Sequence, residues 1–267
     1  MPRLTKLSRS IKGKIALVTG AASGMGQATA YLFADEEATV AVLDRNAEGV
    51  TRVVEEIKQA GGNATGWTLD LSNSEDIEPT VTQIAEHFGG LDILINNAGT
   101  TRFIDFPDLD AVTDEDWERI FAVNLKGPFQ MARAARKALA AGEGGVIVNT
   151  ASIAGMVGAG SSIPYCASKA ALINLTLSLA RTLGPAIRVN AVAPGFIEGE
   201  WLQKGLGEAY GQVKETKAAG TVLGAVSTPD DVAQGILAMV TAPKTTGHTL
   251  VIDGGDTIGP RIEQGLK

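Results

Sequence analysis

A glycine-rich turn between an apolar run and a helical stretch constrains the fold of this chain most. The run Ile15–Val18 is typical of a buried parallel strand, and the turn Thr19-Gly-Ala-Ala-Ser-Gly-Met-Gly26 follows it directly. A strand, a glycine turn and a helix in this order form the fingerprint of a dinucleotide-binding unit. Gly20 would allow the sharp turn, Gly24 the approach of a pyrophosphate and Gly26 the close packing of helix on strand. Taken in isolation, the motif also fits a glycine turn that binds nothing.

The rest of the chain alternates apolar runs with helical stretches. This alternation predicts an α/β fold, a doubly wound parallel sheet with helices on both faces. Further strands are expected at 39–43, 64–69, 91–95, 146–148, 187–192 and 249–252. With 267 residues, 45% of them hydrophobic, we expect a single catalytic domain over 11–267. Residues 1–10 are basic and polar without an apolar core, so we expect a flexible leader and not a secretory signal.

An acidic residue closes the second expected strand. Asp44 follows the run Thr39–Leu43, about twenty residues after the glycines, where a carboxylate can bind both ribose hydroxyls of NAD and repel a 2′-phosphate. Its neighbour Arg45 could instead accept a 2′-phosphate. The glycine turn carries Ser23, and no basic residue, before Gly24. These residues favour NAD over NADP, although Asp44 also fits a helix N-cap.

Tyr165 and Lys169 stand four residues apart in a helical stretch, so their side chains share one face. A neighbouring cation favours the phenolate and lowers the pKa of tyrosine. The pair is therefore typical of a phenol that exchanges a proton near neutral pH. Taken alone, the same spacing is common by chance and also fits a surface pair.

Together these motifs resemble the classical short-chain dehydrogenase/reductase family from about Ile11 to Gly255. The motifs that carry the resemblance are Thr19–Gly26, Asp70, Asn96–Gly99, Asn124, Ser152, Tyr165 with Lys169, and Pro194–Gly195. The resemblance implies a Rossmann-type sheet of about seven parallel strands. It also implies a homotetramer whose interfaces use the helices that carry Asn124 and Tyr165.

The family resemblance assigns catalytic roles to four residues. Tyr165 would be the acid/base, and Lys169 would lower its pKa and hold the nicotinamide ribose. Ser152 would hydrogen-bond the substrate oxygen, and Asn124 would position a water in a proton relay from Lys169. From residue type alone, a helix asparagine such as Asn124 is more typical of a structural role.

The resemblance also places residues around the cofactor. Asp70 would take the adenine amino group, although it equally fits an N-cap before residue 74. The expected cofactor-binding residues are Gly20, Ser23, Gly24, Met25, Gly26, Asp44, Arg45, Asp70, Leu71, Asn97, Ala98, Gly99, Tyr165, Lys169, Pro194, Gly195 and Ile197. Gly199 departs from the family, which usually has threonine there to bind the nicotinamide carboxamide.

The substrate is expected under a lid formed by about residues 196–226. Apolar side chains for a pocket there are Phe196, Trp201, Leu202, Leu206, Tyr210 and Val213. The three lysines of this segment, Lys204, Lys214 and Lys217, could meet an anionic substrate or simply cover a polar helix face.

Composition excludes several classes of partner. The net charge of −7 argues against nucleic acid and anionic membranes, and no apolar run is long enough to span a membrane. Cys166 is the only cysteine, which fits a reducing compartment and a cytoplasmic location. Neither His87 nor His248 stands in a ligand pattern, so we expect no catalytic metal.

The predicted function is hydride transfer between NAD(H) and a small-molecule secondary alcohol or ketone. A first alternative is an NADPH-dependent reductase of 3-oxoacyl thioesters on acyl carrier protein. A second is a non-catalytic protein that senses nucleotide, which the presence of Asn124, Ser152, Tyr165 and Lys169 disfavours.

Overall fold

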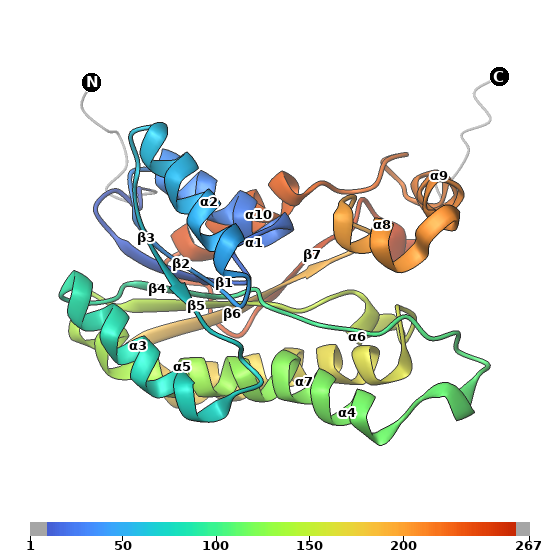
Figure 1. Cartoon of the computed structure of the whole chain (residues 1–267), viewed down its shortest axis with the longest axis horizontal. Helices are drawn as coiled ribbons and strands as arrows, with labels where there is room; N and C mark the ends of the chain where they lie inside the picture. Colours follow the sequence, from blue (N-terminus) through green and yellow to red (C-terminus); the bar gives the residue numbers. More distant parts are fainter. Residues whose placement is uncertain (1–9, 260–267) are drawn as a thin grey trace.

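Seven parallel strands form one sheet in the order β3-β2-β1-β4-β5-β6-β7 (Figure 1). The computed structural model describes residues 10–259. The strands are β1 (Ile15–Thr19), β2 (Thr39–Asp44), β3 (Asn63–Thr68), β4 (Ile93–Asn96), β5 (Gly145–Thr150), β6 (Ile187–Pro194) and β7 (Thr249–Ile252). Strand β1 pairs with β2 on one side and β4 on the other, so the order of the strands reverses there. Ligands of open α/β sheets bind at the carboxyl edge beside such a reversal.

Helices cover both faces of the sheet, as Figure 1 shows: α1, α2 and α10 on one face, and α3, α4, α5 and α7 on the other. The helices on the first face are α1 (Gly24–Asp35), α2 (Ala47–Gln59) and α10 (Pro229–Thr241). Those on the second are α3 (Ser74–Phe88), α4 (Asp114–Phe121), α5 (Gly127–Ala141) and α7 (Ile163–Leu183). The remaining helices are α6 (Ala154–Val157), α8 (Glu200–Leu206), α9 (Tyr210–Gly220), the 3₁₀ turns η1 (Leu109–Ala111), η3 (Gly207–Ala209) and η4 (Asp256–Ile258), and the π-helical turn η2 (Ala122–Lys126).

Both faces of the five inner strands are buried, which explains their nearly continuous apolar runs in the sequence. In β1, Ala16 and Val18 pack into the core under α1 and α10, and Leu17 between them packs into the opposite core. Every one of these three side chains is fully buried. The expected fold class is thereby confirmed, and the ends of the strands differ from the expected ranges by at most two residues. The expected leader falls on residues 1–9, which lie outside the described part, and on Ser10.

Two acidic residues that fitted helix N-caps are not caps. The N-cap of α2 is Asn46, whose side chain accepts from the backbone N–H of Gly49, and the N-cap of α3 is Asn73. The alternative cap roles of Asp44 and Asp70 are therefore wrong. Both carboxylates remain at the carboxyl edge of the sheet.

The connection from β6 to β7 leaves the sheet over the segment 196–226, which is the segment expected to be the lid. Helices α8 and α9 lie together at one end of the molecule (Figure 1, orange). A parallel bridge between Ile197 and Ser227 closes the base of this excursion. Gly199 precedes α8 with φ +150°, a backbone conformation that favours glycine, so the residue that departs from the family fits its local geometry.

Within residues 10–259, no helix has the length and apolar character needed to cross a membrane.

Candidate active site

A long cleft follows the carboxyl edge of the sheet, from the end of β2 to the lid. It is lined by all the expected cofactor-binding residues except Gly26, Pro194 and Gly195. Of the four expected catalytic residues, Tyr165 and Lys169 line the cleft. Ser152 and Asn124 lie directly behind them, and both are buried. The fold thus brings together motifs that are more than a hundred residues apart in sequence.

The glycine turn forms one end of the cleft. Gly20 and Gly24 have positive φ angles of 67° and 54°. A side chain at Gly24 would point into open space, whereas a Cβ at Gly26 would lie 2.1 Å from the carbonyl oxygen of Gly20. Gly26 therefore permits the packing of α1 on the turn, as the sequence predicted. Ser23 caps α1 without a side-chain hydrogen bond, so the first N–H groups of the helix stay available to a phosphate.

A threonine fastens the glycine turn to the neighbouring strand. Thr19 Oγ1 accepts from the backbone N–H groups of Asn97 and Ala98, both at 3.0 Å, and donates to the carbonyl of Ile95. The Asn97 amide in turn donates to the carbonyls of Thr19 and Gly20 at 3.2 Å. These bonds hold the backbone from Asn97 onward as one wall of the cleft.

Asp44 is the last residue of β2 and lines the cleft. Its Oδ2 accepts from the N–H of Ala22 at 3.1 Å, and its Oδ1 accepts from the N–H of Asn46 at 2.9 Å. Each oxygen keeps a free lone pair for a further donor such as a ribose hydroxyl. Arg52 lies nearby, because its Nη2 donates to the carbonyl of Ala22 at 2.8 Å.

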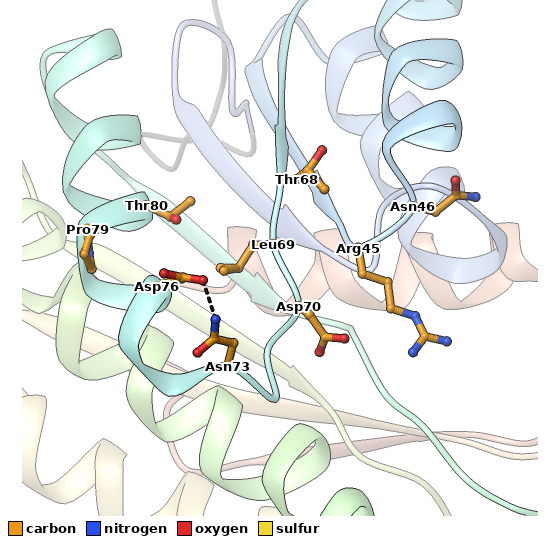
Figure 2. A pocket seen from close by; sticks show the side chains of 9 residues that line it. All are labelled: Arg45, Asn46, Thr68, Leu69, Asp70, Asn73, Asp76, Pro79 and Thr80. Atoms are coloured by element: carbon orange, nitrogen blue, oxygen red, sulfur yellow. Dashed lines mark hydrogen bonds between the residues drawn. The ribbon is translucent and has the colours of Figure 1, made fainter.

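A second hollow, which shares Arg45 and Asp70 with the cleft, lies between the ends of β2 and β3 and the start of α3 (Figure 2). Figure 2 shows Arg45 and Asp70 on neighbouring segments at its mouth. Asp70 accepts from the N–H and the hydroxyl of Ser72 at 2.9 and 2.8 Å. These bonds lower the pKa of Asp70, with smaller contributions from the charges of Arg45 and Arg119. An ionised acceptor here suits an amino group such as that of adenine.

Tyr165 and Lys169 lie in the first turns of α7, and both are buried. Tyr165 is hydrogen-bonded to Ser152. Lys169 Nζ donates to the carbonyl of Thr150 at 2.7 Å and lies 5.7 Å from the centre of the Tyr165 ring. The ammonium is therefore over the ring face, beside the end of β5.

Burial controls the titration of this pair. It raises the pKa of Tyr165 to about 12, although the bond with Ser152 acts in the opposite direction. It also lowers the pKa of Lys169 to about 8. The pKa of Tyr165 is thus raised, whereas the spacing of Tyr165 and Lys169 alone led us to expect that it would be lowered. The reason is that loss of solvent disfavours both charged forms, and the ammonium faces the ring.

Asn124 lies in the π-helical turn η2, where α4 passes into α5. Its Oδ1 accepts from the N–H of Thr100 at 2.8 Å, and its Nδ2 donates to the carbonyl of Thr100 and to the hydroxyl of Ser168. A Cβ on Gly99 would lie 3.5 Å from both Asn124 Oδ1 and Lys169 Nζ. Asn124 and Lys169 therefore approach each other across Gly99. π-Helical turns of this kind are frequent at functional sites.

Two residues near this site were missed by the sequence analysis. Ser168 is fully buried and links Asn124 to α7, because its hydroxyl also donates to the carbonyl of Tyr165 at 2.7 Å. The sequence could have indicated Ser168, because it directly precedes Lys169. Phe103 contacts the lid helix α8, and nothing in its local sequence indicates that contact.

Comparison with known proteins identifies the family. The model of the short chain dehydrogenase family matches residues 14–208. A protein of Streptomyces violaceoruber that carries the name of a ketoacyl reductase of granaticin polyketide synthase is 42% identical, over 90% of this chain and 95% of its own. The galactitol 2-dehydrogenase of Agrobacterium fabrum is 37% identical, over 92% of this chain and 98% of its own. A crystal structure of NAD⁺-bound xylitol dehydrogenase superposes with a TM-score of 0.83 at 29% identity, over 92% of this chain and 99% of that one. The chain belongs to the short-chain dehydrogenases/reductases, oxidoreductases that bind a nicotinamide cofactor and act on alcohol or keto groups of small molecules.

Proposed function

We propose that the protein transfers hydride between NAD(H) and a secondary alcohol or its ketone, with Tyr165 as the acid/base. The observation that carries this proposal is the position of the Tyr165 hydroxyl, buried, bonded to Ser152 and beside the cleft that starts at the glycine turn. A carbinol releases hydride only as its hydroxyl proton departs, so a proton acceptor must stand beside that oxygen. Residues 11–267 would act as one catalytic domain with the segment 196–226 as its lid.

The residues of the cleft fit a bound dinucleotide. The open side of Gly24 and the uncapped start of α1 suit a pyrophosphate, and Asp44 suits a ribose. When bound, the nicotinamide supplies the hydride chemistry, and the protein supplies alignment and polarity. Lys169 and the backbone of Ile197 would hold the nicotinamide end, and Asp70 and Leu71 the adenine.

The chain's own groups would divide the proton chemistry. Tyr165 would take the substrate proton at its phenolic oxygen on oxidation and return it on reduction. Ser152 would donate to the substrate oxygen as its charge changes. The charge of Lys169 favours the phenolate only while the ammonium keeps its proton, and Asn124 would hold a water in a relay that resupplies it.

The choice of NAD over NADP is assigned to Asp44. Replacing Asp44 by alanine should lower kcat/KM for NADH by roughly 10- to 100-fold, because hydrogen bonds to a charged group contribute about 1.5–3 kcal/mol. The kcat/KM for NADPH should fall less or should rise, since the repulsion between Asp44 and its 2′-phosphate is removed. The measurement is the ratio of kcat/KM for the two cofactors. Asp44→Asn, which keeps an acceptor without the charge, should give a ratio between that of the unmodified enzyme and that of Asp44→Ala. An unchanged ratio in Asp44→Ala would assign the selectivity elsewhere.

A second candidate is an NADPH-dependent reductase of 3-oxoacyl thioesters. Besides the Streptomyces relative, a protein of Thermotoga maritima named 3-oxoacyl-[acyl-carrier-protein] reductase is 38% identical over 92% of this chain and 98% of its own. Arg45 and Arg52 line the cleft near Asp44 and could accept a 2′-phosphate. Faster turnover of 3-oxoacyl thioesters with NADPH than of simple ketones with NADH would establish this function instead.

We also propose a homotetramer in the cytoplasm. Large apolar side chains are exposed on the outer faces of α4, α5 and α7, namely Trp117, Phe129 and Leu177. Such a surface favours contact with further copies of the chain. Light scattering should give four times the chain mass of 27.6 kDa, and Phe129→Glu should lower that mass. A monomeric mass for the unmodified protein would contradict the proposal.

The single buried Cys166 fits the proposed location, because the cytoplasm is a reducing compartment.

A further inference from the structure

An aromatic side chain of the lid lies over the proposed acid/base. The ring centre of Trp201, in α8, is 6.1 Å from that of Tyr165, and the rings meet edge to face. The ring centre of Trp201 is also 6.5 Å from that of Phe103, a residue that precedes α4 in the chain. Trp201 is 45% exposed, and it lines the same cleft as Tyr165.

A glycine of the same helix fixes the position of Trp201. Gly205 is four residues after Trp201, so both lie on one face of α8. A Cβ at Gly205 would lie 2.0 Å from Cε2 of Phe103, a distance that no packed side chain reaches. A larger residue at this position would require α8 or the Phe103 ring to shift. The contact between Gly205 and Phe103 therefore holds Trp201 over Tyr165.

The other side of Tyr165 is also apolar. Ala154, Tyr165 and Cys166 form a small buried cluster, and Phe106 packs against it. Around the reacting hydroxyl the polar partner is Ser152, which the proposed chemistry already uses. A polar group placed against this apolar side of Tyr165 would lose hydration without gaining a hydrogen-bond partner.

The lid lysines do not offer free charge to a substrate. Lys214 pairs with Glu198, Lys204 with Glu200 at 3.3 Å, and Lys217 with Asp256 at 3.6 Å. These are the three lysines of the segment 196–226, and that segment has no arginine. Each of these three lysines therefore already has a carboxylate partner.

We propose that Trp201 selects a neutral alcohol or ketone that carries a flat apolar group, such as an aryl ring, on the reacting carbon. Gly205 is the positioning residue that keeps Trp201 in place through Phe103. This inference rests on the proposed function, because it concerns the substrate of the same site. An aryl group would stack on the exposed ring of Trp201, whereas an open-chain polyol would leave hydroxyl groups unpaired against it.

The test compares 1-phenylethanol with xylitol in the presence of NAD⁺. The unmodified enzyme should favour 1-phenylethanol in kcat/KM by about tenfold or more, and Trp201→Ala should remove about that factor for 1-phenylethanol alone. Trp201→Phe, which keeps an aromatic ring, should retain most of the preference. A preference for xylitol, or an equal loss for both substrates in Trp201→Ala, would overturn the inference.

A matched pair of glycine variants tests the positioning role. Gly205→Ala should raise KM for 1-phenylethanol and lower the preference toward that of Trp201→Ala, while the Kd for NADH stays unchanged. Gly211→Ala is the control in the next lid helix, where a Cβ would meet nothing within 4 Å, and it should behave as the unmodified enzyme. Equal effects of the two variants would overturn the role of Gly205.

Calorimetric binding of acetophenone to the protein loaded with NAD⁺ separates this inference from the proposed function. Binding that Trp201→Ala weakens about tenfold, together with no hydride transfer to any substrate, would refute the proposed function and support the aryl site. Turnover of alcohols without any dependence of acetophenone binding on Trp201 would refute the aryl site and leave the proposed function standing. Absence of both turnover and binding would refute both.

Discussion

Replacing Tyr165 by phenylalanine is expected to lower kcat by roughly 10²- to 10⁴-fold, the range that a positioned acid/base contributes. The substitution removes one oxygen from a buried ring and keeps the ring contacts with Trp201 and Lys169. The Kd for NADH should therefore stay near that of the unmodified enzyme. Steady-state turnover and NADH fluorescence titration measure the two quantities separately.

The neighbouring thiol provides the control for this experiment. Cys166 is buried in the same helix turn and packs in the same cluster. Cys166→Ala should keep turnover within a few-fold, because the proposal gives the thiol no chemistry. Near-normal turnover in Tyr165→Phe would refute the assignment of the acid/base. A loss of NADH binding in that variant would leave the kcat comparison to be made at saturating cofactor.

Replacing Lys169 by methionine is expected to abolish most turnover and to stabilise the fold at pH 7. Burial holds the pKa of Lys169 near about 8, below its ordinary value of 10.5. Below pH 8 the ammonium is charged in both states, and the folded protein carries the full cost of burying it. That cost disappears as the pH rises from about 8 to about 10.5, so this group makes the protein more stable over that window.

The size of the effect follows from the shift. A difference of about 2.5 pH units corresponds to about 3 kcal/mol, and loss of the charge-assisted bond to the Thr150 carbonyl offsets about 1.5–2 kcal/mol of the gain. We expect Lys169→Met to unfold with a free energy about 1–2 kcal/mol higher at pH 7, an advantage that shrinks toward pH 10. Denaturant unfolding at the two pH values measures it. Lys12→Met, at an exposed pair with Glu37, is the control. A less stable Lys169→Met protein at pH 7 would contradict this account.

The sheet could be predicted because burial on both faces leaves a direct record in the sequence. Runs such as Ile15–Val18 contain no polar residue, which is the composition of a strand covered by helices on both sides. The glycine turn could also be predicted, because its three glycines serve three separate steric needs.

The residues that cap the helices could not be predicted. Asp44 and Asn46 are two residues apart, and both are good N-caps, so only the backbone path shows that Asn46 takes the role.

Contacts between distant segments could not be predicted. Phe103 and Gly205 are a hundred residues apart, and the sequence does not indicate that one ring replaces the missing Cβ of the other. Asn124, in the π-helical turn, bonds to Thr100 and Ser168, which lie more than twenty residues away on either side in the sequence. The pKa of Tyr165 depends on how far water is excluded, and a spacing of four residues gives no measure of burial.

Nicotinamide absorbance during turnover tests the central claim most directly. The purified protein is assayed with a panel of secondary alcohols, ketones and 3-oxoacyl thioesters, with NAD(H) and NADP(H) in parallel. The account predicts turnover of an alcohol and its ketone with NAD(H), lost in Tyr165→Phe. Turnover confined to 3-oxoacyl thioesters with NADPH, or alcohol oxidation that survives in Tyr165→Phe, would contradict it.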